Sequence, residues 1–160
     1  HDKMELQNLR EGWCYGTASV SMVLLEAASI CNNESIYKKA YSQLCEVAKM
    51  TVEEMYLTNE ILCHGYAGMA ALYRILYDLY KEPLFEQKAR YLLKNIIEAY
   101  TPNSKYGSVS EDVAFYNGIR VTRSCDKIDF LEGNTGAIIE LSSWIKDSSN
   151  YEEMLMLKSF

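Results

Sequence analysis

The most regular pattern in the chain is the recurrence of apolar residues at helical spacing. Apolar residues at i, i+3, i+4 and i+7 lie along one face of an α-helix. Two segments, 35–49 and 85–100, follow this rule, with charged and polar residues elsewhere on the helix. We therefore predict two surface helices, each with one buried face. The buried positions are Ile36, Ala40, Leu44 and Val47 in the first, and Phe85, Ala89, Leu92, Leu93, Ile96, Ile97 and Tyr100 in the second.

Two other segments, 18–30 and 67–79, are apolar around most of the helix circumference. A helix of that kind is buried on several sides. The pattern thus predicts inner helices that alternate along the chain with the two outer ones.

A glycine-led repeat marks the start of each inner helix. The segments 14–25, 63–73 and 131–141 align without gaps, and each has glycine at its third position. In the second and third segments another glycine follows three residues later, where the first has Ser19. Each segment then continues into an apolar stretch, so the third repeat predicts one more inner helix. The glycines are Gly16, Gly65 and Gly133, followed by Gly68 and Gly136.

An irregular insert separates the second outer helix from the last inner one. Its polar, turn-rich part, 101–110, is typical of a surface loop. In 114–121, Asn117-Gly118 stands between β-formers, which predicts a small β-hairpin. No linker divides the chain, so we expect residues 1–160 to form a single, otherwise all-α domain of layered helical hairpins.

Composition narrows the class of protein. The chain has 160 residues, of which 49% are hydrophobic and 24% charged, and its net charge is −6. An acidic chain without a basic patch is not expected to bind nucleic acid. No run of about 18 apolar residues predicts a membrane span, and residues 1–5 do not resemble a signal peptide. We expect a cytoplasmic protein.

The cysteines supply the candidate chemistry. There are five, an odd number without a C-x-x-C pair, which favours reduced thiols over a disulfide framework. Cys31, Cys45 and Cys125 are interpreted as packed side chains. Cys14 and Cys63 occupy the same place in two aligned repeats, and His64 follows directly. Two cysteines and one histidine form one of the ligand sets of open zinc sites. From the residues alone, packing and zinc binding are about equally supported.

The motifs around these cysteines resemble a known family. Trp13-Cys-Tyr-Gly16 and Cys63-His-Gly-Tyr-Ala-Gly68 are similar to the paired zinc motifs of lanthionine synthetase C-like cyclases. The segment 130–141 is similar to the last glycine repeat of that family. The resemblance covers essentially the whole chain, in the correct order. It implies part of an α/α toroid of inner and outer helices, with Zn²⁺ at one end.

The resemblance also implies the ligands and the reaction. Cys14, Cys63 and His64 would hold the zinc ion, and Arg10 and Tyr15 match positions near the active site of the family. Members from lantibiotic biosynthesis add a peptide cysteine to dehydroalanine or dehydrobutyrine, which forms a lanthionine or methyllanthionine thioether ring. A thiol is mostly protonated at neutral pH, and zinc would favour its thiolate. Arg10 would stabilise the enolate oxygen, and Tyr15 would assist proton transfer; without the resemblance we would interpret Arg10 as solvated and Tyr15 as packed.

Partners and location follow from the same resemblance. The expected substrate is a dehydrated precursor peptide. A dehydratase and a transporter of a biosynthetic complex are the further expected partners, and they would place a cytoplasmic protein peripherally at the membrane.

The chain departs from the family in length. The cyclases are well over twice as long, and the three glycine-led units here correspond to their C-terminal part. A histidine and an aspartate that the family places near zinc come from the earlier part. Because three hairpins cannot close a ring, apolar surface is expected at the open edges. The resemblance therefore implies a C-terminal fragment, one piece of a cleaved protein or a truncated relative that self-associates. The alternatives to a cyclase are a non-catalytic zinc or thiol-binding module, similar to glutathione-binding members, and a helical scaffold.

Overall fold

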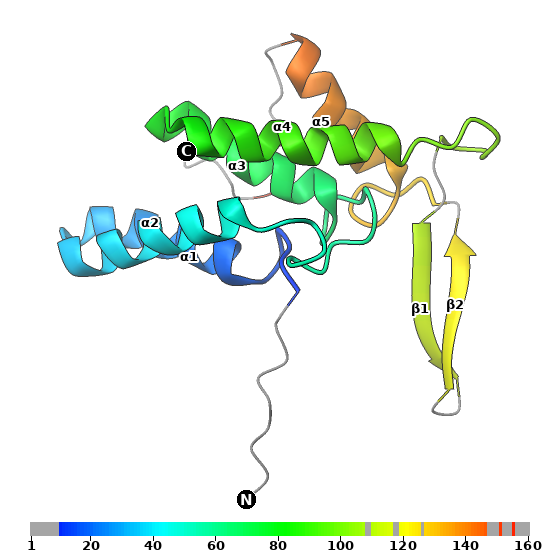
Figure 1. Ribbon diagram of the computed structural model, residues 1–160, viewed down its shortest axis with the longest axis horizontal. Helices are drawn as coiled ribbons and strands as arrows, with labels where there is room; N and C mark the ends of the chain where they lie inside the picture. Colours follow the sequence, from blue (N-terminus) through cyan, green and yellow to red (C-terminus); the bar gives the residue numbers. More distant parts are fainter. Residues whose placement is uncertain are drawn as a thin grey trace, which may run out of the picture.

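Helical hairpins form the body of the molecule. The computed structural model describes residues 10–107, 110–116, 119–125, 127–146, 151 and 155. Helix α1 packs against α2, α3 against α4 and α5, and α2 against α4 (Figure 1). The elements within these residues are α1 (Thr17–Ile30), α2 (Glu34–Lys49), α3 (Tyr66–Tyr80), α4 (Pro83–Glu98), β1 (Ser110–Tyr116), β2 (Ile119–Cys125) and α5 (Asn134–Lys146).

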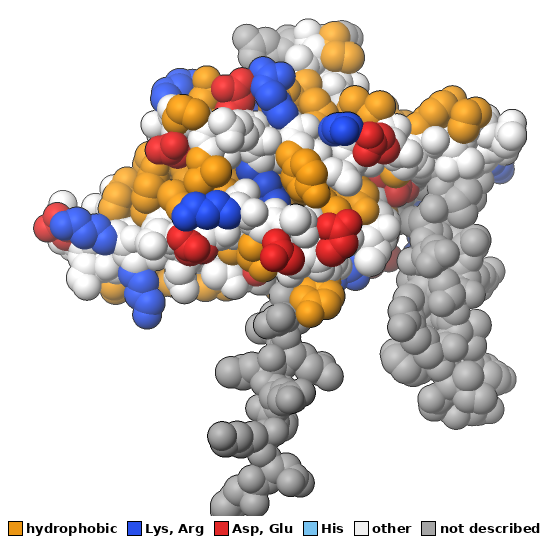
Figure 2. Space-filling model, in the orientation of Figure 1, with side chains coloured by type: hydrophobic (Ala, Val, Ile, Leu, Met, Phe, Trp, Pro, Cys, Tyr) orange, Lys and Arg blue, Asp and Glu red, His pale blue; other side chains and the backbone are white. Residues whose placement is uncertain are grey.

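Helices α2 and α4 are the surface helices that the apolar stripes predict. Each begins with a side-chain cap: Asn33 accepts from the amide of Ile36, and Glu82 accepts from that of Leu84. Charged side chains of both signs surround the apolar ones on the face that Figure 2 shows. The stripes are narrower than expected, since Ile36, Ile97 and Tyr100 are exposed. The buried members are Ala40, Leu44 and Val47 in α2, and Phe85, Ala89, Leu92 and Ile96 in α4.

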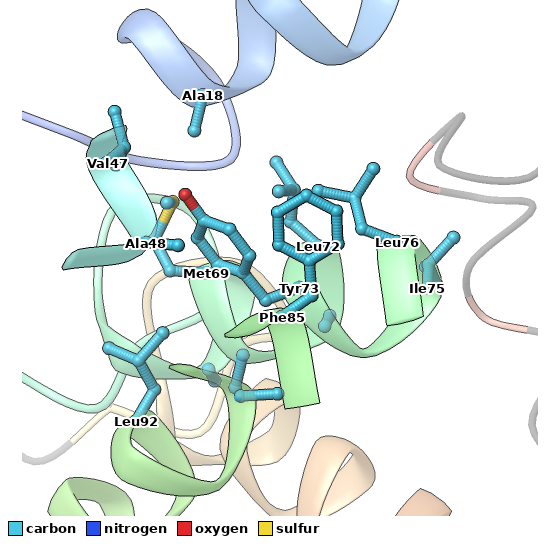
Figure 3. Packing of buried hydrophobic residues seen from close by; sticks show 14 of the residues in the cluster. Ala18, Val47, Ala48, Met69, Leu72, Tyr73, Ile75, Leu76, Phe85 and Leu92 are labelled. Atoms are coloured by element: carbon cyan, nitrogen blue, oxygen red, sulfur yellow. The ribbon is translucent and has the colours of Figure 1, made fainter. Parts of the chain in front are cut away.

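Helix α3 is the centre of the core, as its all-round apolarity predicts. Every residue from Ala67 to Tyr73 is buried, and so are Ile75 and Leu76. The rings of Tyr73 and Phe85 lie 5.8 Å apart between α3 and α4 (Figure 3). The hydroxyl of Tyr73 donates to the carbonyl of Leu44 at 3.0 Å, which satisfies the one polar atom of this side chain in the apolar interior.

Helix α1 is less buried than the sequence predicts. Its buried residues are confined to one stripe, whereas Val20 and Val23 are 55% and 67% exposed. The expectation of burial on several sides is wrong for α1, because α2 is its main helical neighbour in the described chain. Apolar exposure recurs on α5, where Ile138 and Ile145 are 55% and 82% exposed. These two helices carry the exposed apolar edges that we expected. None of the described helices has the length and apolarity needed to cross a membrane.

The insert contains the expected hairpin. Strands β1 and β2 pair antiparallel, with Ser110 opposite Cys125 at one end and Tyr116 opposite Ile119 at the other. The pairing is longer than 114–121, and Asn117-Gly118 lies outside the described residues. Figure 1 shows this hairpin projecting away from the helices.

Steric crowding explains why the repeat has a second glycine. A Cβ on Gly68 would lie 1.9 Å from the carbonyl oxygen of Leu62, and one on Gly136 would lie 2.3 Å from that of Phe130. In both repeats the loop before the inner helix folds back over its first turn. Only glycine allows that approach, and as a result the residues before the helix lie against its N-terminal end.

Candidate metal centre

The structure brings Cys14, Cys63 and His64 together. Their ligand atoms all lie within 4.8 Å of one another, and the two Sγ atoms are 3.1 Å apart, with the thiol of Cys63 donating to the sulfur of Cys14. Cys14 is exposed, while Cys63 and His64 are half-buried. The residues come from the loops that precede α1 and α3, so equivalent loops of the repeat meet at one end of the helical array.

Backbone hydrogen bonds hold these loops in order. The amide of Cys14 donates to the carbonyl of Cys63 at 3.3 Å, and the amide of Cys63 donates to that of Leu131 at 2.8 Å. Leu131 is the first residue of the third aligned repeat, at the position that cysteine occupies in the other two. The sequence analysis missed this support, because Leu131 contributes through its backbone.

A buried carboxylate fixes the start of α1 beside Cys14. Glu11 is 4% exposed, and its two oxygens accept from the amides of Thr17 and Ala18, each at 3.0 Å. These amides belong to the helix N-terminus, where a negative charge is stabilised. The sequence analysis missed Glu11, yet a signal was present: Glu11 and Glu60 stand three residues before Cys14 and Cys63, and Glu60 is also 4% exposed.

Arg10 and Tyr15 both lie near the three residues. The ring of Tyr15 stacks on that of His64, with centroids 6.4 Å apart, and its side chain is 43% exposed. Arg10 donates from Nη2 to the hydroxyl of Thr58 at 3.1 Å, while its buried Nε has no hydrogen-bond partner. Arg10 is close enough to Cys63 for its charge to lower the pKa of that thiol.

Other effects on Cys63 outweigh that of Arg10. Burial, followed by the hydrogen bond to Cys14 and the charge of Cys14, raises the pKa of the Cys63 thiol to about 12. The charge of Glu132 acts in the same direction. Without a cation Cys63 therefore keeps the proton that it donates to the sulfur of Cys14, and a bound cation would displace this proton.

Comparison with known proteins assigns the family. The model of the family described as lanthionine synthetase C-like protein matches residues 2–157. The chain belongs to the lanthionine synthetase C-like family. Among curated relatives, the nisin biosynthesis protein NisC of Lactococcus lactis subsp. lactis is 24% identical over 143 residues, which are 88% of this chain and 28% of that protein. This lanthionine synthetase C-like chain thus spans under a third of the length of that relative.

The solved structure of a nisin cyclase shows the same fold. It matches with a TM-score of 0.67 and 22% identity, over 96% of this chain and 33% of the other. The predicted fold class, helical hairpins that form part of an α/α toroid, is confirmed for this lanthionine synthetase C-like chain.

The donor set fits a zinc ion. Zn–S bonds are about 2.3 Å and Zn–N bonds about 2.0–2.1 Å long, so two sulfurs at a tetrahedral ion lie about 3.8 Å apart. The sulfurs of Cys14 and Cys63 are 3.1 Å apart, so they would need to move apart by less than an ångström to bind such an ion. Three protein ligands would leave one position for a water or a substrate.

The remaining cysteines lie outside this cluster. Cys45 is half-buried in α2, and burial raises the pKa of its thiol, in agreement with a packed side chain. Cys31, which we expected to be packed, is exposed at the end of α1. That expectation was wrong, because no part of the chain that the structure describes covers the end of this helix. The side chain of Cys125 lies outside the described residues.

An apolar cavity of about 290 Å³ lies between α4 and α5. Its walls include Ile96, Tyr100, Ala137 and Leu141, with Glu60 and Asn134 as polar members. None of the three candidate ligands lines it. The candidate metal centre is therefore a separate feature, open to solvent at Cys14.

Proposed function

We propose that this chain carries the zinc centre of a lanthionine-forming peptide cyclase, held by Cys14, Cys63 and His64. The observation that supports this most directly is the convergence of the three ligand atoms within 4.8 Å of one another. The chain also belongs to the lanthionine synthetase C-like family. NisC and the nisin cyclase are named for nisin biosynthesis and cyclisation. By analogy, the proposed substrate here is a dehydrated precursor peptide.

The proposed reaction adds a cysteine sulfur of the peptide to the β-carbon of a dehydroalanine or dehydrobutyrine residue. A C–S bond forms, the electrons of the C=C bond move toward the carbonyl to give an enolate, and the α-carbon then takes up a proton. The proton of the attacking thiol leaves to solvent or a base, so the ring is an isomer of the linear peptide. When bound, zinc would lower the pKa of a substrate thiol at its open position.

Arg10 is suited to stabilise the negative charge of the enolate oxygen. Its Nε is a buried donor without a hydrogen-bond partner among the described residues, and a guanidinium presents its donors in a fixed, planar geometry. A fixed donor aimed at a developing oxyanion contributes more than one that must first be freed from another partner. We assign Arg10 to stabilisation of the enolate oxygen.

Tyr15 is suited to proton handling or to orientation of the peptide. Its ring is exposed and lies beside His64, so a peptide that approaches the ligands would meet it. Complete catalysis is assigned to a longer assembly, because the chain covers 33% of the nisin cyclase. The dehydratase and transporter as partners, and the cytoplasmic location, remain predictions.

The first test is the zinc content of the purified chain. Under reducing, chelator-free conditions we expect one zinc per chain by elemental mass spectrometry. Cys14→Ala and Cys63→Ala should lose it, because removal of one ligand leaves two. Cys31→Ala is the matched control, since it removes an exposed thiol outside the cluster. A wild-type chain without zinc would refute the proposal.

The second test separates a cyclase from a zinc or thiol-binding module. A dehydrated peptide is incubated with the zinc-loaded chain, alone and with the N-terminal portion of a family member. Ring formation removes a free thiol without a change in mass, so resistance to alkylation at constant mass reports it. Rings that form only in the supplemented reaction, and are lost in Cys63→Ala, support the proposal. Zinc binding without rings in either reaction favours the binding module.

A further inference from the structure

Trp13 makes a contact that the proposed chemistry does not use. Its indole Nε1 donates to the backbone carbonyl of Leu155 at 2.9 Å. Leu155 is 3% exposed, although it lies close to the C-terminal end of the chain. Because Trp13 directly precedes Cys14, this hydrogen bond connects Leu155 to the candidate metal centre.

Tyr151, the other described residue beyond α5, is held by side chains of α3 and α5. Its hydroxyl hydrogen-bonds to the carboxylate of Glu140 and accepts from Arg74 at 3.4 Å. Its ring meets that of Phe130 edge-on, with centroids 6.4 Å apart, and the residue is 7% exposed. The amide of Leu155 donates to the carbonyl of Tyr151 at 3.3 Å, so the two anchors are joined.

The other side of Trp13 lies against α3. A Cβ added to Gly68 would be 3.0 Å from the Cβ of Trp13, which places Trp13 on the first helical turn. Between Trp13 and α1 the chain has no regular structure, and the amide of Cys14 has a long hydrogen bond of 3.3 Å to Cys63. The contacts of Trp13 therefore hold the backbone in place next to Cys14, the exposed candidate ligand.

We infer that Leu155, which is joined to the anchored Tyr151, clamps Trp13, and that Trp13 is a positioning residue for the Cys14 sulfur. The ligand role of Cys14 rests on the proposed function; the clamp itself does not require the metal. Partners that orient a ligand strengthen metal binding, since the loop is ordered before the ion arrives. Loss of the clamp should leave the ligands present but less well placed.

Two variants remove the clamp from opposite sides. Trp13→Phe keeps an aromatic ring without the N–H donor, and a chain that ends at residue 154 lacks the Leu155 acceptor. Tyr73→Phe is the control, because it also removes an aromatic donor to a backbone carbonyl, that of Leu44, away from the cysteines. Each variant is compared with the wild-type chain. If the truncated chain fails to fold, the full-length Trp13→Phe variant decides the outcome.

The first measurement needs no metal: hydrogen exchange of the backbone amides of residues 13–16. Both clamp variants should exchange faster than wild type, and Tyr73→Phe should not. The second is Co²⁺ binding, followed by the thiolate-to-cobalt absorption bands. We expect Trp13→Phe to bind roughly tenfold more weakly with shifted bands. Combining it with the truncation should weaken cobalt binding by less than the sum of the two separate effects, because both changes remove the hydrogen bond between Trp13 and Leu155.

The outcomes separate the two proposals. Wild-type exchange rates in Trp13→Phe would overturn the clamp, whatever the cobalt result. Equal weakening of cobalt binding by Trp13→Phe and Tyr73→Phe would overturn the positioning role. If wild type binds no cobalt while Trp13→Phe exchanges faster, the clamp stands and the proposed function fails.

Discussion

The amide of Cys63 donates a 2.8 Å hydrogen bond to the carbonyl oxygen of Leu131, its counterpart in the next glycine-led repeat. Cys14 is joined to Cys63 by the same kind of bond. Three equivalent loops are thus linked in one row, but only two of them bear a thiol. The repeat accordingly supplies two candidate ligands and one backbone support.

Gly68→Ala should unfold or strongly destabilise the chain. The new methyl group would meet the carbonyl oxygen of Leu62 at 1.9 Å, and this backbone atom cannot rotate away as a side chain does. We expect a loss of about 3 kcal/mol or more in the free energy of unfolding, measured by urea denaturation. Gly107→Ala is the comparison: its Cβ would have no neighbour closer than 3.5 Å, although its φ of +92° is strained. Equal losses in the two variants would contradict the steric argument.

The metal-free chain should form a disulfide between Cys14 and Cys63. Their sulfurs are 3.1 Å apart, so hydrogen peroxide can oxidise the two thiols to one disulfide, with release of two waters. Peptide mapping under non-reducing conditions should find these two cysteines joined, with Cys31 and Cys45 left as thiols. Zinc added beforehand should protect the pair. A crosslink that involves Cys31 instead would show that the sulfurs are not neighbours.

Breaking the buried pair of Arg74 and Glu140 should be costly. Glu140 is fully buried and accepts from Arg74 at 3.0 and 3.2 Å and from the indole of Trp144 at 2.8 Å. Glu140→Leu removes the carboxylate that pairs with Arg74 inside the protein, which should cost about 3–5 kcal/mol in urea denaturation. Arg74→Leu combined with Glu140→Leu should recover part of that loss.

The exposed pair Glu34–Lys38 is the control for this prediction. Its side chains are 78% and 73% exposed. Glu34→Ala should therefore leave the unfolding midpoint almost unchanged. Similar effects of Glu140→Leu and Glu34→Ala would show that Glu140 is not buried against Arg74.

Lys88 should make stability depend on pH. Burial lowers the pKa of its ammonium from 10.5 to about 8, and the charge of Glu54 opposes this only in part. Between these pH values the unfolded chain binds the proton more strongly, so stability should rise with pH. Across this pH range the free energy of unfolding should increase by about 3 kcal/mol at most. Urea denaturation at several pH values in this range should show the free energy of unfolding rising more steeply in wild type than in Lys88→Met. The same pH dependence in both proteins would refute the role of Lys88.

Much of the fold was predictable because its signals are local. Helices α2 and α4 follow from apolar spacing, and the hairpin follows from Asn117-Gly118 between β-formers. The pairing of Cys14 with Cys63 was also foreseeable, since their positions in the repeat put both before an inner helix. Each of these inferences needs only neighbouring residues or a repeated motif.

The exposure of α1 and the supports of the metal centre depend on distant parts of the chain. The apolar residues of α1 do not indicate which other segments cover them. The sequence pattern therefore predicted burial on several sides for a helix in which Val23 is exposed. The acceptors for Trp13 and Cys63 are backbone carbonyls of Leu155 and Leu131, which any residue type could supply.

The sequence by itself therefore determined the helices, the glycine positions and the residue types of the candidate ligands, because periodicity, sterics and ligand chemistry act through residue identity. Only the tertiary structure decided that Leu131 supports Cys63, that Glu11 caps α1 and that Leu155 holds Trp13. These contacts depend on where the folded backbone passes, and a pattern of side chains does not encode that directly.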